Sequence, residues 1–472
     1  MLALAWGLGT AAFAQPVAGA PAPALPAEVE AALARTRIPR EALSLWVADV
    51  QAAHKATPRL AYRAQVPANP ASVMKLVTTY EALDQLGPAY TWKTPVYVDG
   101  SVQAGVLKGQ VYLQGLGDPK LVVERLWLML RRLQAEGIHT IQGDIVLDGS
   151  AFQLPEHDPG RFDGEPLRPY NAAPEALLIN YKSVVMTFVP DAAAGVARIQ
   201  YEPPLAGVQR PATVPLAAPG AECGDWRTAL KAELADAARV SFQGVYPATC
   251  GERAWPVAYA DPRSYAARAI EGLWKELGGR LTGGVREGKL PPGARLAFTA
   301  TSPTLAEVVR DVNKYSNNVM AQQLFLSVAL QRGSPATLDT AREVLRQWWQ
   351  ARWPDLDVPQ VDNGAGLSRE ARITAQALGR MLHTAWASPV MPELASSLPI
   401  AGVDGTLRRS QSRAAGAAHL KTGSLRDVNA IGGYVHAANG RRYVLVAFIN
   451  HPNAGAGRPV LDAITDWVMG AP

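Results

Sequence analysis

The chain has 472 residues, of which 48% are hydrophobic and 18% charged, a globular composition with enough length for two or three cores. The net charge of +5 is spread without a Lys/Arg block or interleaved aromatic residues, which argues against nucleic-acid binding. Ordinary surface charge and weak attraction to an anionic polymer are both compatible with it. After the first residues, no segment is apolar enough to predict a membrane-spanning helix.

The first residues resemble an export signal. Residues 1–14 form an apolar run that ends in Ala12-Phe-Ala14, a small-x-small pattern that predicts cleavage before Gln15. The run is too short to span a bilayer. Its usual basic start is missing, so we expect the natural chain to begin further upstream. We therefore predict an exported, periplasmic protein with a flexible Ala/Pro-rich leader up to about Pro26.

Two strands and a helix follow the leader. Residues 43–50 and 59–65 are strand-like and could form a hairpin. The spacing of apolar residues then predicts a helix over 72–86, which Gly87-Pro88 ends. The apolar positions of this helix recur at helical spacing, so most of the helix should lie in a core.

The middle of the chain contains a weak internal repeat. Residues 130–146 and 270–285 each read as a helix, a Gly-containing turn and a strand. In this alignment Ile141, Gly143 and Ile145 correspond to Leu281, Gly283 and Val285. The repeat predicts a second domain built from two related halves, although coincidence is the alternative. The Pro-rich segment between the halves predicts an irregular, β-rich third domain.

The end of the chain mirrors its beginning. Residues 430–437 and 442–449 are strand-like and are separated by Asn439-Gly440, a strong hairpin signal. Residues 458–469 predict a closing helix with a proline in its first turn. The two ends could therefore build one α/β domain, with everything between them inserted into it.

The chain has two cysteines, Cys223 and Cys250. In an exported protein an isolated pair predicts one disulfide. Two buried free thiols are the alternative. Neither cysteine lies beside a histidine-bearing motif, so a catalytic cysteine is not expected.

Ser72 and Lys75 are candidates for nucleophilic catalysis. A serine hydroxyl is a poor nucleophile at neutral pH and needs a nearby base. Lys75 lies one helical turn further on the same face, so its amine can reach the serine oxygen. Burial, and the charge of Lys421 opposite, would favour the neutral amine that a base requires. The helix N-terminus can add an oxyanion donor, whereas a plain N-cap is the alternative for Ser72 alone.

Ser316 and Asn318 lie at the start of a helix predicted over 317–330. A second hydroxyl near the nucleophile can relay a proton to the leaving amine. The amide of Asn318 can hold Lys75 in place and bind the substrate backbone. By themselves, these residues fit a polar loop and N-cap before an apolar helix better than a catalytic role.

The run Lys421-Thr422-Gly423-Ser424 lies on a predicted strand that starts near Ala418. Gly423 would allow a substrate backbone to lie against the strand. The hydroxyls of Thr422 and Ser424, with the charge of Lys421, suit a substrate carboxylate. The backbone N–H of Ser424 can be a second oxyanion donor. An exposed edge strand with a turn is the alternative.

No cofactor or metal is expected from the sequence. The seven histidines show no metal-ligand spacing, and the chain lacks a Gly-x-x-x-x-Gly-Lys-Ser/Thr phosphate loop.

In this order, Ser72-Val-Met-Lys75, Ser316-Asn-Asn318 and Lys421-Thr-Gly423 resemble the motifs of β-lactamases and penicillin-binding proteins. Further blocks resemble those of the low-molecular-mass class C penicillin-binding proteins, the D-alanyl-D-alanine carboxypeptidase/endopeptidase family. These blocks are Gly115-Leu-Gly-Asp-Pro119, Gly143-Asp-Ile-Val-Leu-Asp148, Asn363-Gly-Ala-Gly-Leu-Ser-Arg369, Leu398-Pro-Ile-Ala-Gly402, Asp404-Gly-Thr-Leu407 and the cysteine pair.

The resemblance implies an α/β (α+β) fold. A serine penicillin-recognising domain, similar to that of β-lactamases and transpeptidases, would be split by a long insertion carrying two further domains. We expect the catalytic domain at residues 27–92 and 295–472, inserted domain II at 93–150 and 256–294, and nested domain III, with the disulfide, at 151–255.

The resemblance also implies a serine D,D-carboxypeptidase/endopeptidase that cleaves D-alanyl bonds of peptidoglycan through an acyl-enzyme and binds penicillin covalently. Its partners would be stem peptides and β-lactams, with no nucleic acid and no membrane span. The expected roles are nucleophile for Ser72, base for Lys75, assistance by Ser316, Asn318 and Lys421, and substrate binding by Thr422, Gly423 and Ser424.

Arg369, with an acidic residue near Glu165, is expected to bind the diamino-acid side chain of the stem peptide. The alternatives to the whole assignment are a β-lactamase or esterase of the same superfamily and a non-catalytic peptidoglycan-binding protein.

Overall fold

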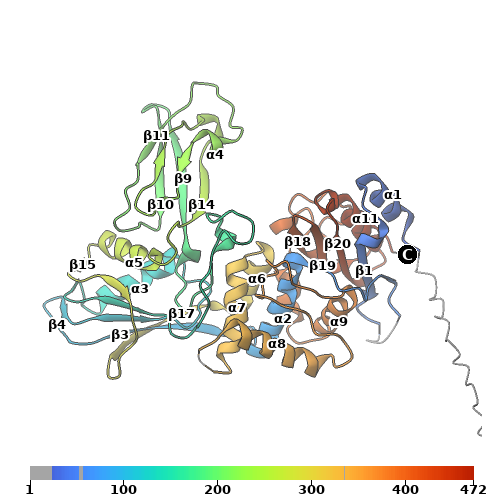
Figure 1. Ribbon diagram of the computed structural model, residues 1–472, viewed down its shortest axis with the longest axis horizontal. Coiled ribbons are helices and arrows are strands. Elements are labelled where there is room, and N and C mark those ends of the chain that lie inside the picture. The colour runs from blue at the N-terminus through green and yellow to red at the C-terminus, as the bar shows by residue number, and fades with distance from the viewer. Residues whose placement is uncertain (1–23, 53–56, 334, 472) are drawn as a thin grey trace, which may run out of the picture.

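The computed structural model describes residues 24–52, 57–333 and 335–471. Figure 1 shows a body that contains both described ends of the chain, a lobe beside it, and an upright module above the lobe. The export signal predicted at residues 1–14 lies outside the described residues. Within them, no helix is both long and apolar enough to cross a membrane.

Strands from both ends of the chain form the five-stranded sheet of the body. All neighbours are antiparallel, in the order β18 (Ala418–Leu425), β19 (Val428–His436), β20 (Arg442–Asn450), β1 (Leu43–Asp49) and β2 (Leu60–Tyr62). Both β1 and β20 are buried along nearly their whole length, as their almost continuous apolar runs require. One face of the sheet packs against α1 (Ala27–Thr36) and α11 (Arg458–Met469).

The other face of the sheet packs against a helical layer. The layer consists of α2 (Lys75–Leu86), α6 (Leu305–Lys314), α7 (Asn318–Leu330), α8 (Leu338–Arg352), α9 (Ala375–Trp386) and α10 (Met391–Ser397). Helix α7 is buried on all sides, because every residue from Asn318 to Ala329 is buried and no distinct face of the helix is polar. A helix without a polar face is stable only inside a protein, so α7 is a fixed element of the core.

The lobe contains two small sheets and two helices. One sheet has the order β16 (Val285–Glu287), β8 (Ile145–Asp148), β6 (Val111–Gln114), β3 (Thr91–Val98) and β17 (Arg295–Thr304). The other has the order β15 (Arg280–Leu281), β7 (Thr140–Ile141), β5 (Val106–Lys108) and β4 (Ser101–Gln103). The helices are α3 (Val123–Ala135) and α5 (Tyr265–Glu276).

The structure confirms the internal repeat. Each copy is a helix followed by a turn and two short strands, and the matching strands pair in parallel. Leu281 is the register partner of Ile141, and Val285 is the partner of Ile145. The aligned residues therefore lie side by side across a pseudo-symmetric seam.

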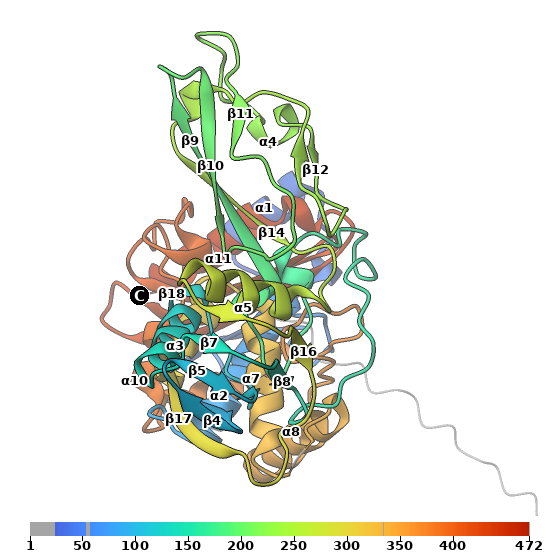
Figure 2. The same ribbon diagram turned by 90° about the vertical axis from the view of Figure 1, so that its left-hand side faces the viewer.

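The upright module rises above α5 in both views (Figures 1 and 2). Its main sheet has the order β11 (Thr213–Pro215), β10 (Val196–Glu202), β9 (Ser183–Asp191) and β14 (Arg253–Ala258). Its other elements are β12 (Ala232–Glu233), β13 (Ser241–Phe242) and α4 (Trp226–Ala229). Cys223 and Cys250 form the disulfide, so the free-thiol alternative is wrong. Buried Cys250 belongs to the small core of the module, in which Phe188 stacks on Tyr246.

Most of the predicted elements of the body are confirmed, with changes at their ends. The closing helix has the predicted bounds, and the predicted hairpin is β19 and β20. Strand β2 is shorter than expected, and the helix expected from Ser72 begins as a 3-10 turn, Ala71–Met74, with α2 starting at Lys75. The domain boundaries given above stay a prediction.

Candidate active site

Ser72 lies in the turn that leads into α2. Ala71 has a φ of 47°, so the chain bends sharply just before the serine. Neither the turn nor α2 has a side-chain cap, so the N-cap alternative for Ser72 is wrong. The Nζ of Lys75 lies 3.0 Å from the Oγ of Ser72, as the spacing of the two residues predicts.

Lys75 is completely buried and meets two further oxygens. Its Nζ lies 2.6 Å from Oδ1 of Asn318 and 2.6 Å from the carbonyl oxygen of Ala365. The amide of Asn318 also donates from Nδ2 to the carbonyl of Tyr170, at 3.2 Å, which orients Oδ1 toward the lysine. A neutral amine has two hydrogens and one lone pair. If these two acceptors take the hydrogens, the lone pair faces the hydroxyl of Ser72.

The surroundings of Lys75 favour this neutral amine. Burial lowers the pKa of Lys75 well below its ordinary value, and the nearby charge of Lys421 lowers it further. Both effects act against the ammonium form. The site therefore favours a neutral amine at a pH where an exposed lysine would be protonated.

Ser316 and Lys421 form a second hydroxyl–amine pair. The N-cap of α7 is Asn317, whose side chain accepts the N–H of Met320. The hydroxyl of Ser316 therefore takes no part in capping the helix. Ser316 itself has a φ of 57°. The Nζ of Lys421 lies 2.9 Å from the Oγ of Ser316 and 2.7 Å from the carbonyl of Thr422. Burial lowers the pKa of Lys421 to about 7.

Gly423 brings strand β18 against the turn that contains Ser72. A Cβ at this position would lie 2.5 Å from the carbonyl oxygen of Pro70 and 3.1 Å from the backbone nitrogen of Ser72. No side chain fits there without moving the backbone. The sequence predicted that this glycine leaves room for a substrate. The structure shows a more immediate reason for a glycine here, namely the close contact between strand β18 and the turn.

Thr422 and Ser424 are the strand residues on either side of Gly423. Thr422 is half-buried, and its hydroxyl lies 2.7 Å from the hydroxyl of Thr406. Ser424 is exposed. The edge-strand alternative for this run is correct as to position, because β18 is the last strand of its sheet. It is wrong for Lys421, which is completely buried.

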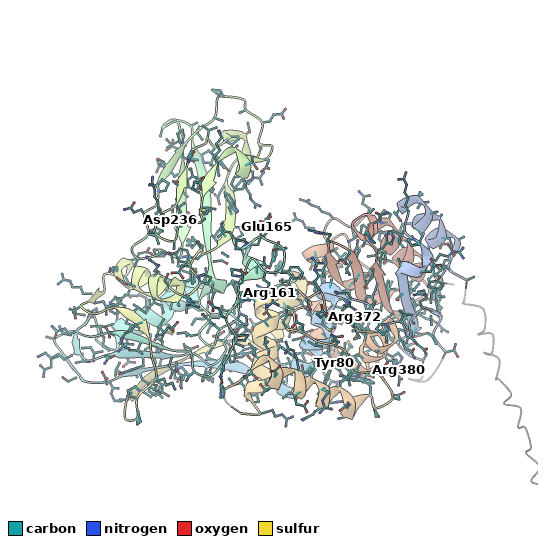
Figure 3. All side chains as sticks on the ribbon, viewed as in Figure 1. Tyr80, Arg161, Glu165, Asp236, Arg372 and Arg380 are labelled. Carbon is teal, nitrogen blue, oxygen red and sulfur yellow. A yellow bond between two sulfur atoms is a disulfide. The ribbon has the colours of Figure 1, made fainter. Side chains whose placement is uncertain are left out.

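Arg369 lies where three parts of the chain meet. Its Nη1 lies 3.1 Å from Oδ1 of Asp427, in the turn between β18 and β19. Its guanidinium also covers the ring of Phe162, 4.8 Å from the ring centre. Glu165 follows Phe162 on the same segment, which passes between the upright module and the body (Figure 3). Glu165 is exposed and pairs with Arg168 at 3.3 Å.

Sequence reasoning missed three contributors to this site. Tyr170 and Phe162 come from the long segment before β9, and Thr406 comes from the turn before β18. The first two lie in a Pro/Gly-rich run without periodicity, so no local pattern points to them. Thr406 belongs to a block that the sequence singled out, but without a role.

Comparison with known proteins identifies the family. Residues 25–469 match the D-Ala-D-Ala carboxypeptidase 3 (S13) family, and the chain therefore belongs to this family of serine peptidases. The match spans nearly all the described residues.

Two relatives and one solved structure illustrate the similarity. The chain is 27% identical to a D-alanyl-D-alanine carboxypeptidase of Actinomadura sp. (strain R39), over 84% of this chain and 76% of the relative. It is 25% identical to the D-alanyl-D-alanine carboxypeptidase DacB of Haemophilus influenzae, over 82% of this chain and 81% of the relative. The crystal structure of penicillin binding protein 4 from Haemophilus influenzae has a TM-score of 0.71 at 23% identity, covering 93% of this chain and 99% of that one. The expected penicillin-recognising fold is thereby confirmed.

Replacing Lys421 by methionine should change how stability depends on pH. An unfolded lysine keeps its proton up to about pH 10.5, whereas folded Lys421 loses it near pH 7. The unfolded chain therefore binds more protons between these values, and the wild type gains stability relative to the variant as the pH rises through them. Melting temperatures of both proteins at pH values from 7 to about 10 measure this trend. A constant difference between them would show that Lys421 titrates normally.

Proposed function

We propose that this protein is a serine D,D-carboxypeptidase and D,D-endopeptidase that cleaves D-alanyl peptide bonds of peptidoglycan. The reaction would pass through an acyl-enzyme on Ser72, and the same serine would bind penicillin covalently. The observation that carries the proposal is the placement of the buried Lys75 amine, whose two acceptors leave its lone pair toward the hydroxyl of Ser72. Membership of the carboxypeptidase family supports the reaction.

In the first step, the Oγ of Ser72 attacks the carbonyl carbon of the D-alanyl bond while its proton passes to Lys75. The negative charge that develops on the carbonyl oxygen needs N–H donors. The backbone N–H groups of Ser72 and Ser424 are the candidates, because Gly423 brings the strand and the turn together.

In the second step, the C–N bond breaks and the leaving amine takes a proton. Ser316 is suited to pass it on, because its hydroxyl lies 2.9 Å from the amine of Lys421. A group with a pKa of about 7 both gives and takes protons readily at neutral pH. Water then attacks the ester on Ser72 and releases the acid product, with the protons moving back along the same groups.

The substrate carboxylate would bind beside strand β18. Thr422 and Ser424 offer hydroxyl donors, and Lys421 adds positive charge whenever it is protonated. A β-lactam carboxylate would occupy the same place, and one solved structure of the Haemophilus influenzae protein is described as complexed with a novel β-lactam.

Arg369 and Glu165 would bind the zwitterionic end of a diamino-acid side chain. A guanidinium suits the carboxylate of that end, and a carboxylate suits its ammonium. Both residues are partly exposed, and Arg369 contacts Phe162 on the segment that carries Glu165. The ion pair with Asp427 orients the guanidinium before a substrate arrives.

We also infer export to the periplasm, with residues 1–14 as the signal. A cell-wall substrate and the disulfide between Cys223 and Cys250 support this location. Sequencing the N-terminus of the exported protein tests it, since the mature chain should start at Gln15.

Ser72→Ala should abolish covalent penicillin labelling and peptide hydrolysis while leaving the melting temperature nearly unchanged. Lys75→Ala should slow acylation by ~10²–10⁴-fold, the usual loss when a general base is removed. Labelling is measured with a fluorescent penicillin and confirmed by intact-protein mass. Ser101→Ala, at an exposed serine in β4, is the matched control and should label normally. Unchanged labelling stoichiometry in Ser72→Ala would contradict the assignment.

Arg369→Ala should lower kcat/KM for peptides that contain a diamino acid. The expected loss of transition-state stabilisation is about 1–3 kcal/mol, the scale of a hydrogen bond to a charged group. Penicillin acylation should hardly change, because penicillin lacks that side chain. Arg286→Ala removes a surface ion pair in the lobe and is the matched control. Equal losses with peptide and penicillin would mean that Arg369 supports the fold or the catalytic groups instead.

A further inference from the structure

The turn Asp404-Gly405-Thr406 has no place in the reaction described above. It comes before β18 and includes the start of a short 3-10 turn, Gly405–Leu407. The turn nevertheless contacts one catalytic motif directly and lies against the residues just before a second. One contact is at the end of α6, just before Ser316, and the other is at Thr422.

An ion pair fixes the turn to α6. The Nζ of Lys314, the last residue of α6, lies 2.6 Å from Oδ2 of Asp404. The side chain of Lys314 is only 4% exposed. The other carboxylate oxygen of Asp404 accepts the backbone N–H of Ile400 at 2.8 Å. A lysine this deeply buried requires its partner, so the pair holds the turn in one position.

The backbone of the turn is also pressed against α6. Gly405 has a φ of 55°, a conformation that favours glycine. A Cβ at this position would lie 2.6 Å from the carbonyl oxygen of Lys314. The turn is therefore held by an ion pair and by close backbone packing, and Thr406 follows immediately.

The side chain of Thr406 reaches Thr422, the strand residue next to Lys421. Its hydroxyl lies 2.7 Å from that of Thr422, and Thr406 is exposed whereas Thr422 is half-buried. A hydroxyl has one hydrogen and can accept two hydrogen bonds. In the structure Thr422 donates this hydrogen bond to Thr406. When a substrate carboxylate takes the hydrogen of Thr422, the hydroxyl of Thr406 can rotate and donate to Thr422 in return, which keeps the hydroxyl of Thr422 in place.

We propose that Thr406 is a positioning residue that aims the hydroxyl of Thr422 at the terminal carboxylate of the substrate. The inference rests on the proposed function, because it requires Thr422 to bind that carboxylate. Thr406 then contributes to the preference of the enzyme for a free carboxylate over a neutral end. It acts through Thr422 and takes no part in acylation itself.

The experiment compares two peptides that differ only at their end, D-alanyl-D-alanine and D-alanyl-D-alaninamide. Thr406→Val keeps the shape of the side chain and removes its hydroxyl, whereas Thr406→Ser keeps the hydroxyl. We expect Thr406→Val to lower kcat/KM for the acid by about tenfold, mainly through KM, and for the amide by less than about twofold. Thr406→Ser should restore the preference for the acid. Thr301→Val, at an exposed threonine in β17 of the lobe, should behave as wild type with both peptides.

Two results would overturn the inference. Equal losses with acid and amide in Thr406→Val would assign the hydroxyl a structural role, and unchanged rates with both would assign it none. The failure of the proposed function has a separate signature, because wild type would then cleave neither peptide. That result would remove the basis for the inference as well.

Discussion

The active site depends on the contact between strand β18 and the turn before α2. Gly423 lies so close to Pro70 and Ser72 that a Cβ would clash with the backbone of the turn. This contact places Lys421 beside Lys75, although the two residues come from opposite ends of the chain. It exists only because both ends contribute strands to one sheet, with β1 paired to β20. The long segment between the two ends of the chain does not interrupt this sheet, because all of its strands come from the ends.

Two lysines in one buried site have an electrostatic consequence. Each loses hydration on folding, and the charge of Lys421 acts further against a charge on Lys75. The fold therefore favours the neutral form of both amines at a pH where a surface lysine would be protonated. Burying two lysines in this way costs stability, and the cost is tolerated because the surrounding core is extensive, including the fully buried helix α7.

The sequence was sufficient for the elements whose pattern is local. The Asn-Gly hairpin, the closing helix and the serine–lysine spacing each follow from neighbours within one or two turns. The repeat was also visible, because Leu281 and Ile141 occupy equivalent places in matching strands. The three motifs pointed to one site through their chemistry, and the structure brings them together.

What the sequence did not predict depends on contacts between distant segments. The carbonyl of Tyr170 orients Asn318 across 148 positions, and Phe162 meets Arg369 from an irregular segment. The N-cap of α7, which the sequence offered as the alternative for Ser316 and Asn318, is Asn317, whose side chain accepts the N–H of Met320. The reason for Gly423 likewise became clear only when the opposing turn was in place.

The protonation state of Lys75 is the most direct test of this account. NMR of protein with lysine labelled at Cε would follow its titration, with the Lys75 signal assigned by its loss in Lys75→Arg. We predict that Lys75 titrates well below its ordinary value of 10.5, and that Lys421→Met moves its pKa upward by removing the neighbouring charge. A Lys75 that titrates near 10.5 in the wild-type protein would contradict the claim that burial makes it the base for Ser72.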